Sequence, residues 1–103
     1  MHVISRKALR DFWGQHPPAE MPLRTWFTRV NGGTFRNLEE LKSSFPTVDL
    51  IPIRRRGLRR ELYVFNIGGN KYRLVAAIHF NVQRIYVRNV LTHSDYDLEG
   101  WKR

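Results

Sequence analysis

The spacing of the apolar residues changes near residue 48, and this change most constrains the fold. Before it, apolar side chains recur three and four positions apart, as on one face of a helix, within residues 6–16 and 21–30. After it come four segments rich in Val, Ile, Tyr and Phe, which favour strands: 48–53, 61–67, 71–80 and 84–91. Helices followed by consecutive strands predict an α+β fold, with the N-terminal helices packed on one face of an antiparallel β-sheet.

Turn and cap motifs mark the ends of these segments. Pro17-Pro18 ends the first helix, and Asn31-Gly32-Gly33 ends the second. Asn37, with Glu40 three residues later, predicts a capped third helix. The glycines at 68–69 predict a tight hairpin between the second and third of the four strands. A chain of 103 residues without an evident linker predicts one domain, residues 1–103.

The chain is strongly basic, with 18 Lys and Arg against 9 Asp and Glu and a net charge of +9. Most of these cations are arginines, whose planar guanidinium matches phosphate and stacks on bases. This composition favours a nucleic-acid partner over an acidic protein or a merely solvated basic surface. Cysteine is absent, and no segment resembles a signal peptide or a membrane span. We therefore expect a cytoplasmic protein with no membrane contact.

The densest charge is the segment RRRGLRR at residues 54–60, between two expected strands and with Gly57 at its tip. It can act as a clamp on an RNA backbone, or it can be a strand edge that charge keeps soluble and unpaired. A run of arginines indicates an anionic partner but no particular chemistry. We predict that its five arginines bind RNA: Arg54, Arg55, Arg56, Arg59 and Arg60.

The segment THSDYD, residues 92–97, places a histidine, a tyrosine and two aspartates directly after the last expected strand. Thr92 followed by Asp95 has the pattern of a capping box, which explains these two residues by structure alone. Capping requires neither His93 nor Tyr96. The segment is therefore either turn chemistry or part of an active site.

RNA cleavage through its own 2′-hydroxyl gives such side chains a use. A base must take the 2′-hydroxyl proton, cations must stabilise the transition state, and an acid must protonate the leaving 5′-oxygen. Strand alternation places Lys71 and Arg73 on the face opposite the apolar one, which carries Tyr72, Leu74, Ala76, Ile78 and Phe80. Arg88 of the next strand joins the same open face if the register allows. The four histidines show no ligand spacing, so we expect no metal and no other cofactor.

The stretch YVFNIGGNKYRLVAAIHFNVQRIYVRNVLTHSDYD, residues 63–97, resembles the HigB toxins of bacterial toxin–antitoxin pairs. The shared pattern is the FNIGGN hairpin, the KYRL start of the next strand, the YVR strand and the closing THSDYD. The opening MHVISRKAL also fits the family, whereas RRRGLRR is not one of its hallmarks.

This resemblance implies a RelE-like fold and an mRNA interferase, an endoribonuclease that cuts mRNA and stops translation, often on the ribosome. It implies a cognate HigA-like antitoxin as partner, together with mRNA and the ribosome. The family's active positions match Lys71, Arg73, His93 and Tyr96 as catalytic residues, Arg88 as an RNA-binding residue and Asp95 as an orienting residue. Which side chain is the base stays open.

Two other functions remain alternatives. The wider superfamily contains ParE-like poisons of DNA gyrase, which share the fold and cleave no RNA. The presence of both His93 and Tyr96 favours the nuclease, because a gyrase binder needs no proton-transfer pair. A non-catalytic RNA-binding protein is the other alternative, for which the basic loop and exposed aromatics suffice.

Overall fold

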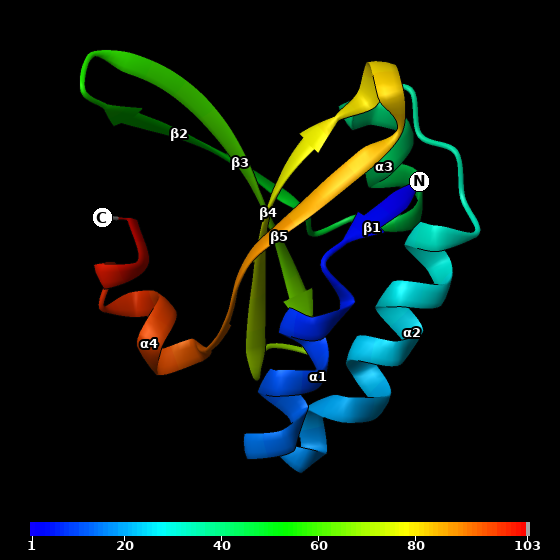
Figure 1. The fold of residues 1–103 in the computed structure, drawn as a ribbon, viewed down its shortest axis with the longest axis vertical. Coiled ribbons are helices and arrows are strands. Elements are labelled where there is room, and N and C mark those ends of the chain that lie inside the picture. The colour runs from blue at the N-terminus through cyan, green and yellow to red at the C-terminus, as the bar shows by residue number, and fades with distance from the viewer. Residues whose placement is uncertain (103) are drawn as a thin grey trace.

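The computed structural model describes residues 1–102, apart from the side chains of Arg55, Arg59 and Lys102 (Figure 1). Three short 3-10 turns, η1 (Pro17–Ala19), η2 (Phe80–Val82) and η3 (Gly100–Lys102), connect or follow the main elements. The helices and strands are β1 (His2–Ile4), α1 (Arg6–Gln15), α2 (Glu20–Asn31), α3 (Leu38–Ser44), β2 (Asp49–Arg55), β3 (Leu58–Ile67), β4 (Tyr72–His79), β5 (Arg84–Thr92) and α4 (His93–Asp97).

The five strands form one sheet in the order β1-β5-β4-β3-β2. The predicted antiparallel meander from β2 to β5 is confirmed. β1 departs from the prediction of an antiparallel sheet, because it pairs in parallel with β5. The N-terminal ammonium donates to the Val30 carbonyl at 3.1 Å, which ties the start of β1 to the end of α2. A strand of three residues, such as β1, has too short a sequence pattern to indicate the direction in which it pairs.

The cap predicted for α3 is present, with a different reciprocal contact. The Asn37 side chain accepts a hydrogen bond from the Glu40 N–H at 2.9 Å. The Glu40 carboxylate accepts from the backbone N–H of Arg36, one residue before the cap, and also pairs with the Arg36 guanidinium, each at 2.9 Å. The backbone hydrogen bond from Arg36 holds the pKa of Glu40 below its ordinary value. The start of α3 is therefore held from both sides.

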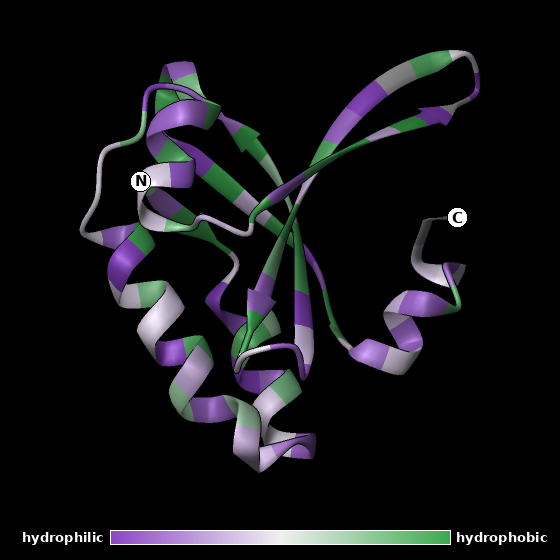
Figure 2. Cartoon of the chain, turned by 180° about the vertical axis from the view of Figure 1, so that it is seen from behind, coloured by the Kyte–Doolittle hydropathy of each residue, from purple (hydrophilic) through white to green (hydrophobic). Residues whose placement is uncertain are grey.

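The main core lies between the sheet and helices α1 to α3, as predicted. Phe65, Leu74 and Ile85 of the sheet are fully buried there. The alternation predicted for β4 and the residue after it is confirmed, because Tyr72, Leu74, Ala76, Ile78 and Phe80 all belong to this core. Figure 2 shows hydrophobic residues recurring along the strands, and Figure 1 shows α1 and α2 on one side of the sheet with α4 on the other.

The opposite face of the sheet carries a smaller apolar cluster. Leu62, Val64 and Val75 are buried in it, and Tyr96 and Trp101 of the C-terminal segment pack against it. This face is therefore partly covered by the segment that follows β5, and it is open beside that segment. No helix in the described part of the chain is both long and apolar enough to cross a membrane.

A β-bulge in β5 lies at Arg88. Val75 pairs with Asn89 and the next residue of β4, Ala76, pairs with Val87, so Arg88 is the extra residue on β5. Bulges of this kind re-aim a side chain and often lie beside functional sites. Arg88 lines a cleft on the open face together with Arg60 and Leu62. The predicted face of Arg88 is thus confirmed, whereas the bulge, after which Val90 returns to the core face, is invisible in the sequence pattern.

Candidate functional site

The start of β4 and the junction of β5 with α4 lie side by side. The His93 N–H donates to the Lys71 carbonyl at 3.1 Å. Two residues further along β4, Arg73 is opposite Leu91 in the register. The antiparallel pairing of β4 with β5 thus brings the KYR motif, residues 71–73 at the start of β4, to the THSDYD segment. The structure places Lys71, Arg73, His93 and Tyr96 in one neighbourhood of the open face.

The guanidinium of Arg73 is held by contacts on two sides. Its Nη1 donates to the carbonyls of Asn70 at 3.2 Å and Tyr72 at 3.1 Å. Its Cζ lies 5.7 Å from the centroid of the Tyr96 ring, within the range of a cation–π contact. Both hydrogen bonds described for this side chain use Nη1. Arg73 is thus a positioned cation.

His93 is oriented by a carboxylate one helical turn away. Its Nδ1 lies 3.0 Å from Oδ2 of Asp97, and both side chains are at least half exposed. An Nδ1–H that donates to this carboxylate leaves Nε2 as the nitrogen that exchanges protons with a substrate. His93 therefore lies at the start of α4 next to Lys71, with its Nδ1 against Asp97.

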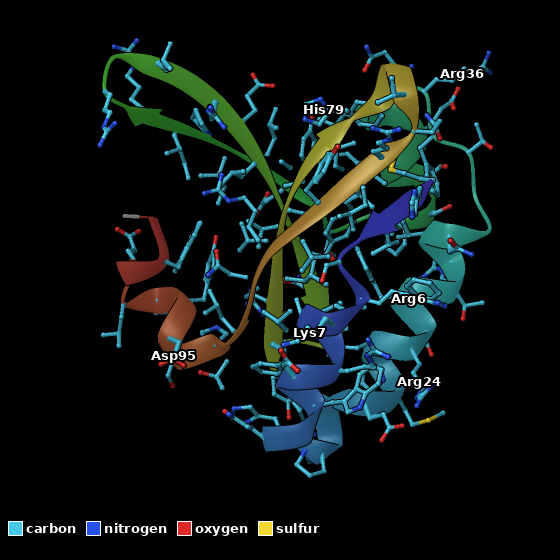
Figure 3. The ribbon with its side chains drawn as sticks, in the orientation of Figure 1. Arg6, Lys7, Arg24, Arg36, His79 and Asp95 are labelled. Atoms are coloured by element: carbon cyan, nitrogen blue, oxygen red, sulfur yellow. The ribbon has the colours of Figure 1, made fainter. Side chains whose placement is uncertain are left out.

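The carboxylate that contacts His93 is not the one that the sequence pointed to. Asp95 was expected to orient the active residues, but its described hydrogen bond is a capping one, from its N–H to Thr92 Oγ1 at 3.1 Å. In a helix the residue at i+4 lies over residue i, whereas i+2 points to the other side. Asp97 is therefore the partner of His93. The position of Asp95 on the same helix is labelled in Figure 3.

Trp101 lies beside the candidate site and was not indicated by the sequence pattern. Its ring stacks on Tyr96 with centroids 5.1 Å apart and planes at 15°, and its Nε1 donates to the Tyr96 carbonyl at 2.9 Å. The signal available in the sequence was a tryptophan among polar residues at 99–103, beyond the last expected element. Nothing in that pattern indicated that the chain folds back onto the sheet.

The arginines of the β2–β3 hairpin fall into different groups. Arg56 and Arg60 line a cleft of about 420 Å³ with Arg88 and Trp101. Arg54 is exposed and follows Ile53, a cleft residue, so strand alternation directs it to the other face of the hairpin. The side chains of Arg55 and Arg59 lie outside the described part of the structure. Gly57 and Arg56 have positive φ angles of 77° and 53°, so the predicted turn at Gly57 is confirmed.

The described residues contain no group of three or more His, Asp or Glu side chains arranged to hold a metal ion. Burial raises the pKa of the Tyr63 phenol, because it disfavours the charged form. This side chain lies in the core on the helix-covered face of the sheet. It is therefore not part of the open-face site.

A helix-covered, mainly antiparallel sheet with a basic cluster beside its last strand is a RelE-like α+β arrangement. Residues 19–99 match the HigB toxin family, which is described as the RelE-like toxic component of a toxin–antitoxin system. This chain belongs to the HigB toxin family. It is 37% identical over 97 residues to the "mRNA interferase toxin HigB" of Escherichia coli K12, covering 94% of this chain and 88% of the relative.

Two further relatives carry similar names. The "mRNA interferase HigB" of Shigella flexneri is 37% identical over 97 residues, with 94% of this chain and 88% of the relative covered. The "mRNA interferase HigB" of Escherichia coli O6:H1 is 28% identical over the same length, with 94% and 89% covered. The family match over residues 19–99 includes Lys71, Arg73, Arg88, His93 and Tyr96 and ends before Trp101.

Proposed function

We propose that this toxin acts as an mRNA interferase, an endoribonuclease that cleaves mRNA and thereby inhibits translation. The observation that supports it most is that His93, whose imidazole contacts Asp97, lies next to Lys71, while the positioned cation Arg73 contacts Tyr96 of the same α4 helix. A protein that only bound RNA would need the charge but not an imidazole held by a carboxylate. The names of the relatives point to the same activity.

The proposed reaction is an internal transesterification. The 2′-oxygen attacks the adjacent phosphorus while its proton passes to a base, the bond to the 5′-oxygen breaks, and an acid protonates that oxygen. The products are a 2′,3′-cyclic phosphate and a 5′-hydroxyl. Arg73 and Lys71 stabilise the extra negative charge of the transition state, and fixed charges of this kind often supply much of the rate. His93 and Tyr96 transfer protons and place the nucleotide.

The partners follow from this function. A cognate, HigA-like antitoxin neutralises the toxin, mRNA is the substrate, and the translating ribosome in the cytoplasm presents that mRNA. The net charge of +9 suits a ribosomal setting, because phosphate-rich RNA surrounds the substrate there.

The experiment that tests the function is mRNA integrity in a bacterial translation extract. We expect discrete fragments with the wild-type protein and intact mRNA with an Arg73→Ala/His93→Ala double variant. Repeating the reaction with the same mRNA and no ribosomes tests the ribosomal setting separately. Intact mRNA with wild-type protein in the extract would remove the interferase function, and a gyrase supercoiling assay would then be the next measurement.

We predict that the hairpin arginines contribute to RNA binding through phosphate contacts. Arg60→Gln should lower the slope of log affinity against log salt concentration by about 0.7, the value for one lost contact on a single strand. Arg10→Gln removes an equal charge from α1, on the helix-covered side, and should leave the slope unchanged. Filter binding of a non-cleavable RNA between low and moderate salt measures both. Identical slopes for Arg60→Gln and the wild type would argue against a phosphate contact.

A further inference from the structure

The cleft on the open face has the chemistry of a nucleotide-binding site. It lies between the β2–β3 hairpin and the C-terminal turn, and its volume is about 420 Å³. Among the described side chains its lining combines aliphatic groups, three arginines and an indole, with no acidic residue: Ile53, Arg56, Leu58, Arg60, Leu62, Arg88 and Trp101. Leu58 is 62% exposed, so an apolar surface is presented to solvent here among cations. Bases require apolar and aromatic surface, whereas phosphates require the arginines.

Trp101 is held in place before any ligand arrives. The stack on Tyr96 fixes the plane of the indole, and the hydrogen bond from Nε1 to the Tyr96 carbonyl fixes its direction in that plane. A side chain that is already ordered loses little rotamer freedom when a base stacks against it. The tryptophan is therefore a prebuilt wall of the cleft.

Tyr96 connects this cleft to the proposed reaction centre. The Arg73 guanidinium lies 5.7 Å from the centroid of the Tyr96 ring, and the Trp101 ring lies 5.1 Å from the same ring. A phosphate at Arg73 and a base against Trp101 are thus separated by a single aromatic side chain. The two sites are adjacent enough to hold neighbouring parts of one RNA strand.

We propose that the cleft binds a nucleotide next to the scissile phosphate, with its base against Trp101 and its phosphate held by Arg60 and Arg88. This inference rests on the proposed nuclease function and adds a cleft that determines which base is accepted beside the cut. An indole that stacks on any base gives affinity, and the walls formed by Leu58 and Leu62 limit the size of the base that fits.

The test compares Trp101→Phe and Trp101→Ala in binding 2′-O-methyl RNA hexamers of each base, which resist cleavage through the 2′-oxygen. Trp101→Ala should weaken binding by about 5- to 150-fold, the range that stacking on one aromatic side chain supplies. Trp101→Phe keeps an aromatic ring and should retain most of the affinity. Leu98→Ala, a change to an exposed neighbour in the same segment that does not line the cleft, should match the wild type.

Steady-state cleavage distinguishes a base contact from a structural role. With the base contact, Trp101→Ala raises KM, alters the preferred base beside the cut and leaves kcat nearly unchanged. A fall in kcat at constant KM would mean that Trp101 only positions Tyr96, which would overturn the proposal. Unchanged RNA affinity with weaker binding of the antitoxin would assign the cleft to that protein instead. Failure of the nuclease function itself would be visible separately, as intact mRNA with the wild-type protein.

Discussion

Arg73→Ala is expected to lower the rate of mRNA cleavage by about 10²- to 10³-fold, the usual cost of removing one fixed donor from a transition-state site. The reason is that Arg73 is held by the carbonyls of Asn70 and Tyr72 and by the Tyr96 ring. A cation fixed in this way meets the charge that develops on the phosphate without having to reorganise. Cleavage should be followed as fragment formation from one mRNA of known sequence, with kcat and KM determined separately.

Binding of RNA should change much less than cleavage in this variant, because the remaining cations of the face still hold the backbone. Arg73→Lys keeps the charge but loses the planar fork, so it should fall between the wild type and Arg73→Ala. Arg84→Ala is the matched control, since Arg84 lies at the other end of the β4–β5 pair, opposite His79. If binding and cleavage fell by equal factors in Arg73→Ala, the role in the transition state would be wrong and Arg73 would be an affinity residue.

The position of Arg73 could be predicted from the sequence because it depends on two local rules. The alternation of β4 separates Arg73 from the core residues on either side of it, and the short turn at residues 80–83 sets the pairing of β4 with β5. Because both rules act over a few residues, an apolar pattern and a turn motif suffice. The same holds for α3, where the Asn37 cap is visible as a motif.

What the sequence did not reveal depends on contacts between distant segments. The bulge at Arg88 shifts the β5 register by one residue, which an alternating pattern cannot show. The return of Trp101 onto the sheet depends on a stack with Tyr96 that has no periodicity. The partner of His93 was within reach, since the predicted cap at Thr92 already implied a helix in which i+4 is the neighbour. Asp97 was missed because the resemblance to the family assigned the orienting role to Asp95.

His93→Ala is expected to lower cleavage by about 10²- to 10⁴-fold, the range that a positioned acid or base contributes. The imidazole is the group best suited to proton transfer in the candidate site, and the contact of its Nδ1 with Asp97 leaves Nε2 for the substrate. Asp97→Asn should cost no more than about fivefold, since the pair is exposed and exposed ion pairs contribute roughly 0–1 kcal/mol. His79→Ala removes an exposed histidine at the far end of β4, well away from α4 in Figure 3, and should leave cleavage unchanged.

A substrate with sulfur in place of the leaving 5′-oxygen at the mapped cut tells which proton His93 transfers. Thiolate is a good leaving group that needs no protonation, so this substrate restores the rate of a variant that lacks only the acid. Rescue of His93→Ala would assign the acid to His93 and leave Tyr96 or Lys71 to assist the 2′-oxygen. No rescue, together with the same loss on both substrates, would assign the base to His93. A cleavage rate in His93→Ala equal to that of the wild type would remove the histidine from the reaction and leave its contact with Asp97 as a feature of the α4 helix alone.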